Sequence, residues 1–497
     1  MRVFEFASHA EYWVALMPEM ILVLTAVAVL MGEAFTRAGD DQTEWTLTVT
    51  IFGLITAIVG NGLLADSTSV PDALLAVDGM RWVADYVLLG GTLLVVIYAG
   101  AYLDRERLPR GDFYALVLFA CVGMMLLVAA QDLILVFVAV ELMSIAVYVL
   151  TGYARQNPRS SEAALKYFLV GAFASAFLLY GIALLYGVTG TTRLSIAAPA
   201  VAAAVANGDM VLTAGLGLLI IGFGFKVGAV PFHMWTPDAY EGAPTPVTAF
   251  MATGVKTAAF VALLRILTVD LAGAHEVWRD AIWWLAILTM IVPNLIALSQ
   301  DNVKRMLAYS SIAHAGYLLV GVAAASALGR SASLFYLAAY TVMTIGSFAI
   351  VFHVAGKGDE RSRVEDFRGL GWRRPGLALT LVIFLLSLSG FPPPAGFIGK
   401  LWLLQAAVEA GEITLAVTLV LTSLVAYYYY LRIVWMMYFQ DASDEIEVPT
   451  RPSAGFRITT AVLAVLLLLA GLVPGKAIDT IRGAVDRGTS PAVAQLE

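Results

Sequence analysis

Long apolar runs alternate with short polar segments along almost the whole chain. Each run is close to the roughly 20 residues that an α-helix needs to cross a bilayer. Fourteen such runs fall near residues 13–33, 46–64, 82–103, 113–130, 133–153, 163–187, 210–235, 245–268, 281–299, 305–325, 332–356, 376–408, 413–440 and 457–475. The pattern therefore predicts an all-α polytopic membrane protein with about 14 transmembrane helices.

Two of the runs contain helix breakers. The breakers are Pro231 in the run 210–235 and, in the run 376–408, Gly390, Pro392, Pro393 and Pro394. The second run is also too long, since an unbroken helix over it would measure about 48 Å against about 30 Å of hydrocarbon. A membrane helix tolerates a break only where the freed backbone groups face protein or water. We therefore expect two broken helices, with a polar cavity at membrane depth beside Pro231.

The runs also group into two similar units of five. The predicted segments are 1–111 with three runs, 112–277 and 278–440 with five runs each, and 441–497 with the last run and a tail. An odd number of spans forces the second unit to be inverted in the membrane, as in many transporters. Lys226 and Lys400 lie in the fourth run of their units, beside the breaks. We predict two inverted five-helix repeats, each with a broken helix.

Composition excludes a soluble protein. The 497 residues are 60% hydrophobic and 13% charged, outside the range of soluble domains. Pro18 and Glu19 at the start of the first run are unlike a cleaved signal peptide, so we expect the run to be retained and Glu19 to reach the membrane interface. Lysine and arginine are about twice as frequent in the odd-numbered loops, which predicts that both termini lie outside the cytoplasm. The loops do not indicate a nucleic-acid partner.

The sequence offers few groups that could bind a metal or form a disulfide. Cys121 is the one cysteine, which excludes an internal disulfide and a cysteine-ligated cluster, and we expect it to be a small core residue. The five histidines lack the spacing of metal ligands. We therefore expect this chain to bind no metal and no cofactor.

Charged residues inside the apolar runs are the candidates for function. Glu141 lies in the middle of its run, where a carboxylate costs about 2.5 to 3.5 kcal/mol on insertion scales, so it needs a partner. Lys226, Lys256 and Lys400 lie in other runs, and Lys256 is close to mid-bilayer. Lys166 lies near the start of its run and is either an interface anchor or a channel residue.

Three further residues are weaker candidates. His314 follows Ser310 and Ser311, and together they could carry a water wire, although a histidine in an apolar helix is more often a core residue. Lys304 stands at the start of the same run. His233 follows the first helix break.

One acid and several lysines at membrane depth indicate a proton path. Burial in apolar surroundings favours the neutral form of a lysine, so Lys226, Lys256 and Lys400 can each gain and lose a proton. We expect Glu141 and Lys226 to form an ion pair whose separation is worth about 1.4 to 4 kcal/mol. That range includes the roughly 2.3 kcal/mol needed to move one charge against 100 mV. A non-pumping scaffold would explain the helices but not a lysine at mid-bilayer.

Three stretches carry a resemblance to a known family. They are KVGAVPFHMWTPDAYEGAPTPVTAF at 226–250, NVKRMLAYSSIAHAGY at 302–317 and GFPPPAGFIGKLW at 390–402. They resemble the antiporter-like membrane subunits of bacterial NADH-quinone oxidoreductase (respiratory complex I), and HMWTPD favours the N-type branch. The resemblance covers all fourteen runs. It matches the family's transmembrane glutamate and its channel lysines to Glu141, Lys166, Lys226, Lys256 and Lys400.

The resemblance implies a proton-translocating subunit of a translocase, driven by electron transfer from NADH to quinone in neighbouring subunits. FMN, iron–sulfur clusters and the quinone site are expected in those subunits. The expected partners are an antiporter-like sibling and small membrane subunits, in the bacterial inner membrane. The L-type branch is longer, and the M-type branch has glutamate in place of Lys400. The D-type subunit of a multisubunit sodium/proton antiporter, which shares that lysine, is the alternative.

Overall fold

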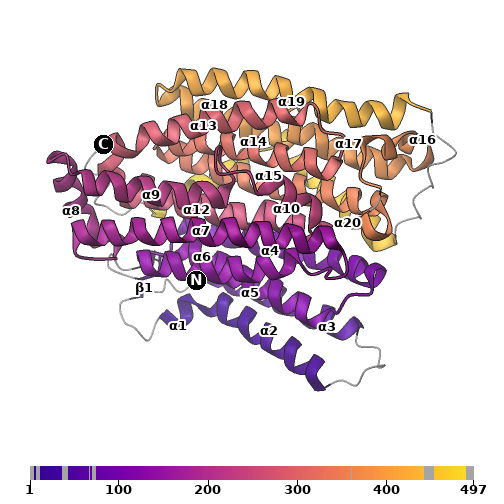
Figure 1. Ribbon diagram of the computed structural model, residues 1–497, viewed down its shortest axis with the longest axis horizontal. Coiled ribbons are helices and arrows are strands. Elements are labelled where there is room, and N and C mark those ends of the chain that lie inside the picture. The colour runs from indigo at the N-terminus through magenta and orange to yellow at the C-terminus, as the bar shows by residue number, and fades with distance from the viewer. Residues whose placement is uncertain are drawn as a thin grey trace.

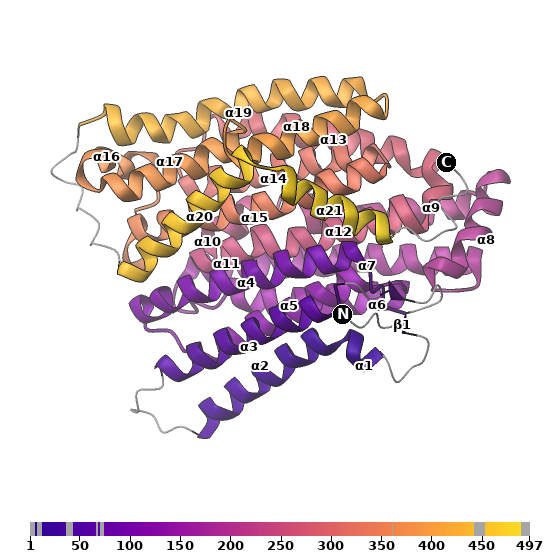
Figure 2. The same ribbon diagram turned by 180° about the vertical axis from the view of Figure 1, so that it is seen from behind.

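The computed structural model describes residues 5–6, 12–35, 43–65, 68–69, 74–359, 361–441 and 453–488. They form a bundle of long helices that run side by side along one direction (Figures 1 and 2). Two short strands, β1 (Glu5–Phe6) and β2 (Thr68–Ser69), pair in parallel. The prediction of an all-α polytopic membrane fold is confirmed.

Thirteen segments of the described chain are long and apolar enough to cross a membrane. They are α2 (Met17–Phe35), α3 (Thr43–Leu63), α4 (Gly79–Glu106), α5 (Gly111–Ala129), α6 (Leu133–Thr151), α7 (Pro158–Thr189), α9 (Met210–Val227), the continuous set α11 (Thr245–Phe250), η2 (Met251–Val255), α12 (Lys256–Arg265) and η3 (Ile266–Asp270), then η4 (Ala272–Ala274) with α13 (His275–Ala297), α14 (Val303–Ala323), α15 (Ala327–Ala355), α19 (Ile413–Phe439) and α20 (Ala454–Leu472). The remaining predicted run forms two shorter helices, α17 (Pro375–Ser389) and α18 (Ala395–Glu409). Each of the fourteen predicted runs therefore corresponds to a helix or, in this one case, to a broken pair.

The shorter elements connect or flank the long helices. They are α1 (Tyr12–Ala15), α8 (Leu194–Ala206), α10 (Thr236–Gly242), η5 (Lys357–Asp359), η6 (Val364–Phe367), α16 (Leu370–Arg373) and α21 (Gly475–Gly488). None of them was predicted as an element of its own, and the two longest are α8, which contains Pro199 and is too short to span, and α21, which is polar on one side. Figure 2 shows α21 lying across the bundle, where it contacts α4 and α15.

Both predicted breaks are present, and in each a glycine ends the first half-helix. Helix α9 stops at Val227 because Gly228 adopts φ 73°, a left-handed conformation that glycine reaches without strain. The helix therefore ends earlier than the predicted run 210–235, before Pro231 is reached. Helix α17 ends in the same way at Gly390, with φ 82°, and α18 begins directly after Pro394.

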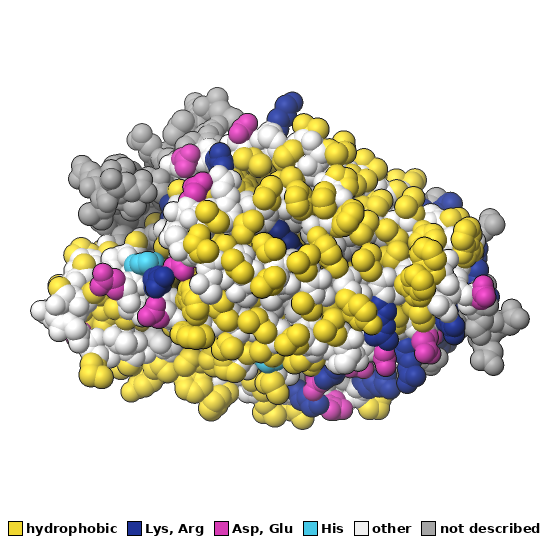
Figure 3. All heavy atoms as spheres, turned by 90° about the horizontal axis from the view of Figure 1, so that it is seen from above, with side chains coloured by type: hydrophobic (Ala, Val, Ile, Leu, Met, Phe, Trp, Pro, Cys, Tyr) yellow, Lys and Arg dark blue, Asp and Glu magenta, His cyan; other side chains and the backbone are white. Residues whose placement is uncertain are grey.

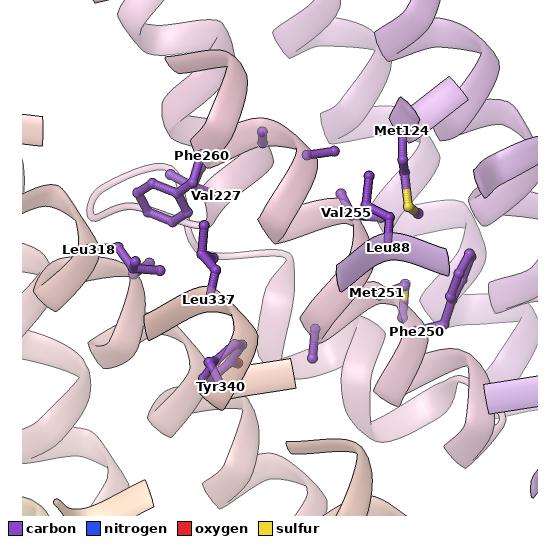
Figure 4. Close-up of a cluster of buried hydrophobic side chains, with 14 of the residues drawn as sticks. Leu88, Met124, Val227, Phe250, Met251, Val255, Phe260, Leu318, Leu337 and Tyr340 are labelled. Carbon is purple, nitrogen blue, oxygen red and sulfur yellow. The ribbon is translucent and has the colours of Figure 1, made fainter. Parts of the chain in front are cut away.

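The centre of the bundle is the segment α11–η2–α12, and the apolar part of this segment is completely buried. Leu88 of α4 and Met124 of α5 lie on one side of Val255, while Leu318 and Leu337 of α14 and α15 lie on the side of Phe260 (Figure 4). On the outside, hydrophobic side chains cover most of the face shown in Figure 3, and charged side chains lie mainly toward its ends. Lys256, the first residue of α12, is therefore placed in the middle of the protein.

Small residues allow the closest helix contacts. A Cβ atom on Gly316 of α14 would come within 2.7 Å of the Met290 backbone nitrogen on α13, and one on Gly181 of α7 within 2.8 Å of the Leu219 nitrogen on α9. Membrane helices associate without a hydrophobic driving force, so close backbone approach and dispersion supply much of the stability. These contacts fix α9 and α14, which carry candidate residues.

Candidate functional site

Helices α6 and α9 bring the first candidates together. Glu141, Ser144 and Tyr148 occupy one face of α6, at spacings of three and four residues. Lys226 is 3% exposed, and its ammonium donates to Ser144 Oγ at 2.7 Å and to Tyr148 Oη at 3.4 Å. Glu141 is half-buried and accepts a hydrogen bond from the Ser175 hydroxyl of α7. Hydroxyl groups therefore satisfy both ionisable residues.

The predicted ion pair between Glu141 and Lys226 is not formed in the conformation described. Both residues belong to the described chain, and no ion pair joins them. Lys226 lies in the last turn of α9, and its ammonium sits beside the ring of Tyr148, with 5.6 Å to the ring centroid. This position is farther along α6 than Glu141. Ser144 occupies the place that the prediction gave to the carboxylate.

Lys256 is buried at the junction of η2 and α12. Its ammonium donates to the carbonyl of Ser311 and, at 2.5 Å, to the Ser311 hydroxyl on α14. The Tyr340 hydroxyl of α15 donates to the same Ser311 oxygen at 2.8 Å. The π-helical turn η2 directly precedes the lysine, and such turns are frequent at functional sites. Lys256 thus depends on Ser311 for its polar contacts.

A set of aromatic rings joins α6 and α7 to the segment after the first break. The ring of Tyr167 meets Tyr148 edge-on at 4.7 Å and stacks on Trp235 at 4.2 Å. Tyr240 of α10 packs edge-on against Trp235. Ring contacts therefore run without interruption from α6 through α7 to α10.

Helix α14 presents a continuous polar face. His314 Nδ1 lies 2.6 Å from the Tyr336 hydroxyl, and its Nε2 lies 3.1 Å from the Tyr430 hydroxyl, which also bonds Ser310. One turn later the Tyr317 ring faces the Lys400 ammonium, 4.6 Å from the ring centroid. This face connects the surroundings of Lys256 to those of Lys400.

The second break holds Lys400 by backbone groups. Lys400 is 5% exposed. Its ammonium donates to the Ser389 carbonyl at 2.8 Å and to the Leu388 carbonyl at 3.2 Å. These carbonyls are at the C-terminus of α17, where the last turn has no intrahelical partners for its acceptors. The break thus creates the binding site for the lysine.

Lys166 lies outside this buried row. Its side chain is 46% exposed and forms ion pairs with Glu162 at 2.7 Å and Asp238 at 2.9 Å. Arg305 of α14 also pairs with Asp238, at 2.8 Å. Partial burial alone would raise the pKa of Asp238, but the hydrogen bonds from Lys166 and Arg305 outweigh it and hold that pKa below its usual range. Lys166 therefore belongs to an exposed ionic network between α7, α10 and α14.

Lys304 and His233 are buried near the same region. The Lys304 ammonium donates to the Ala243 carbonyl at 2.8 Å and pairs with Asp359 at 3.2 Å. His233 is 7% exposed, and its Nδ1 has no hydrogen-bond partner among the described residues. Within the described part of the chain, no hydrogen bond or ion pair joins either residue to the row that runs from Glu141 to Lys400.

Comparisons with known proteins identify the family. A family model described as "NADH:quinone oxidoreductase/Mrp antiporter, TM" matches residues 130–426. NADH-quinone oxidoreductase subunit N from Trichlorobacter lovleyi is 46% identical over 464 residues, which are 93% of this chain and 93% of that protein. The chain belongs to the subunit N family.

Solved structures agree with the subunit N family. In respiratory complex I from Thermus thermophilus with bound aureothin, one chain is 36% identical and matches with a TM-score of 0.77, over 93% of this chain and 98% of that chain. A chain of the Mrp complex from Dietzia sp. matches with a TM-score of 0.81 at 23% identity, over 97% of this chain and 98% of that chain. The second likeness shows a shared fold.

For this member of the subunit N family, sequence patterns located the lysines but not their partners. Ser144 and Tyr148 could have been found, because they follow Glu141 at helical spacing on one face. Tyr336, Tyr340 and Tyr430 carried no signal, because a tyrosine adds no charge to an apolar run. Among the described residues, no group of three histidine, cysteine or acidic side chains could hold a metal ion.

Proposed function

We propose that this chain translocates protons as a membrane subunit of an NADH-quinone oxidoreductase, the activity named for its relatives. One observation carries the proposal: buried ionisable groups form a row through the core, from Glu141 through Lys226, Lys256 and His314 to Lys400, with hydroxyl groups between them. Ionisable side chains at this depth are costly. A non-pumping scaffold would not need such groups, so their presence favours proton translocation.

The first step of transfer is the exchange of partners at Lys226. In the conformation described, the lysine is bound to Ser144 and the glutamate to Ser175. A short movement along α6 brings Lys226 to Glu141, and the approach of a carboxylate favours the charged lysine. Separation then favours release of the proton toward Lys256. Ser311 and the polar face of α14 support the onward steps to Lys400.

Residues outside the row are assigned to its access points. Lys166, with Asp238, and Lys304, with Asp359, lie in ionic networks at one end of the helices, where they can control the charge around an entrance. His233 sits beside the first break and has a buried ring nitrogen available for water. These roles rest on position alone.

The surroundings of the chain belong to the same proposal. The protein lies in the bacterial inner membrane with both termini outside the cytoplasm, and it contacts an antiporter-like sibling and small membrane subunits. FMN, iron–sulfur clusters and quinone are held by other subunits. The repeat boundaries after residues 111, 277 and 440 are part of this proposal.

Substitution of Lys256 tests the proposal. Arginine keeps the charge but does not release a proton in proteins, whereas methionine removes the charge and keeps the volume. If Lys256 carries protons, both variants lose most proton pumping per NADH in membrane vesicles. Lys357→Arg, at an exposed lysine, serves as the matched control and keeps wild-type pumping. Native gels verify assembly, and near-normal pumping by assembled Lys256→Arg would remove Lys256 from the relay.

A further inference from the structure

A second buried ionic cluster lies in the N-terminal helices, apart from the lysine row. Arg81 of α4 pairs with Glu19 of α2 at 2.7 Å and with Asp85, one turn further along α4, at 3.2 Å. The three residues are 3%, 3% and 0% exposed, in that order. Glu19 was expected at the membrane interface, and this expectation is wrong: it is buried because Arg81 binds it.

The cluster has more acceptors than it can satisfy. The Arg81 guanidinium is also committed to the Ala76 and Ala15 carbonyls, at 3.1 and 2.7 Å. One oxygen of each carboxyl group, Glu19 Oε2 and Asp85 Oδ1, is buried without a hydrogen-bond partner among the described residues. Two ionised carboxylates beside one cation would leave a net negative charge in a dry site, and an uncompensated buried charge normally neutralises.

The neighbouring charges do not correct the imbalance. Asp78 accepts from the Arg81 backbone and binds Arg265 of α12 through both oxygens, at 2.5 and 2.9 Å. Among the described residues, the titratable groups of the elements packed here are Glu19 of α2, Asp78, Arg81 and Asp85 of α4, the thiol of Cys121 on α5, Arg265 and Asp270 of α12 and η3, and Arg330 of α15, which donates to the Thr268 carbonyl. Helix α21, which crosses α4 at Gly79, carries side chains of both signs. Outside α21, the carboxyl groups of this set outnumber its arginines.

We propose that the Glu19–Arg81–Asp85 cluster is a proton-binding site, in which one carboxyl group holds a proton at neutral pH. Asp85 is the holder, because Glu19 makes the shorter contact with Arg81 and Asp85 is completely buried. When Asp85 is protonated, its carbonyl oxygen still accepts a hydrogen bond from Arg81. The remaining carboxylate, Glu19, then balances the single guanidinium charge. The site is independent of the proposed pumping role.

The position of the site gives it an electrical connection to the centre of the protein. Asp78 caps α4 directly before Arg81 and clamps Arg265 at the end of α12, the helix that begins with Lys256. Proton gain or loss at Asp85 therefore changes the charge next to the clamp that fixes α12.

Amide substitutions in the complete complex test the assignment. Above about pH 4 an aspartate in the unfolded chain is ionised, so the folded chain binds one more proton than the unfolded chain, and its stability falls as the pH rises until Asp85 loses its proton in the folded chain as well. Asp85→Asn mimics the protonated acid without taking up a proton on folding, so it should be at least as stable as the wild type at neutral pH and should lose less stability as the pH rises. Glu19→Gln removes the ionised partner of Arg81 and should be less stable already at neutral pH. The readout is the fraction of this subunit that stays soluble after heating the purified complex.

Asp280→Asn is the matched control, because the Asp280 side chain is 79% exposed, and it should follow the wild type at every pH. The proposal is overturned if Asp85→Asn is destabilised at neutral pH as much as Glu19→Gln, or if it keeps the full alkaline decline. If Asp85→Asn does not assemble, infrared spectra of the wild-type complex with isotope-labelled aspartate decide. A protonated-carboxyl band that disappears on alkalinisation supports the site, and its absence overturns it.

Discussion

The first helix break is held by one side chain that can be changed without altering the ionisable row. The Val230 backbone N–H, inside the broken segment, donates to Thr289 Oγ1 of α13 at 2.9 Å. Thr289 is 0% exposed, so water cannot replace it. Thr289→Val keeps the shape and removes the acceptor, whereas Thr289→Ser keeps the hydroxyl and removes one methyl group.

The expected effect follows from the cost of an unpaired buried N–H group. Leaving such a donor unsatisfied costs about 1 to 3 kcal/mol, which changes the population of the observed break geometry by about 5- to 150-fold. Loss of the methyl group in Thr289→Ser costs about 0.8 kcal/mol and leaves the bond intact. Because the break begins directly after Lys226, Thr289→Val should lower proton pumping, and Thr289→Ser should lower it much less.

Vesicles with equal amounts of assembled complex, judged on native gels, separate this effect from a folding defect. Proton pumping and NADH oxidation are measured in parallel for the two variants. If Thr289→Val pumps as well as Thr289→Ser at equal assembly, the geometry of the break does not depend on this hydrogen bond, and the reasoning is refuted.

Two further outcomes are expected. Gly316→Ala should reduce the amount of assembled complex on native gels, because its Cβ would lie 2.7 Å from the Met290 nitrogen, whereas Gly217→Ala, with nothing within 4 Å, should assemble normally; equal assembly would contradict the close packing of α13 and α14. Lys166→Met should lower the pumping rate only slightly, since solvent screens its exposed ion pairs. A loss as complete as that of Lys256→Met would place Lys166 in the relay itself.

Much of the fold could be predicted because the bilayer imposes one requirement on every span. Length and apolarity located each long helix, Pro231 indicated the first break, which begins earlier, at Gly228, and Gly390 with the three prolines located the second. The amphipathic helix α21 was not predicted, because it packs across α4 and α15 without crossing the membrane. A search for long apolar runs assigns such a partly polar segment to a loop.

The sequence was enough to predict which charged residues belong to the candidate site, but not which side chains they contact. An isolated Lys256 in a run of apolar residues is visible in any sequence. The partner of Lys226 is not, because a serine, a tyrosine and a glutamate on one face of α6 are all within reach, and only the end of α9 at Gly228 decides among them. The Arg81 cluster was missed for a related reason, since it joins residues that are far apart in sequence.

The two broken helices hold their lysines by different means, and this difference gives the row a direction. At Lys400 the free carbonyls at the C-terminus of α17 bind the ammonium, and the negative end of the half-helix dipole stabilises a cation there permanently. Lys226 lies before its own break, and its ammonium donates to the Ser144 and Tyr148 hydroxyls of α6 rather than to carbonyls at the end of a half-helix. Both partners are neutral, and Glu141, the acid on the same face of α6, is bound to Ser175 in the conformation described. Under the proposed function, the approach of Glu141 therefore controls whether Lys226 keeps its proton, whereas Lys400 is held by a fixed backbone site.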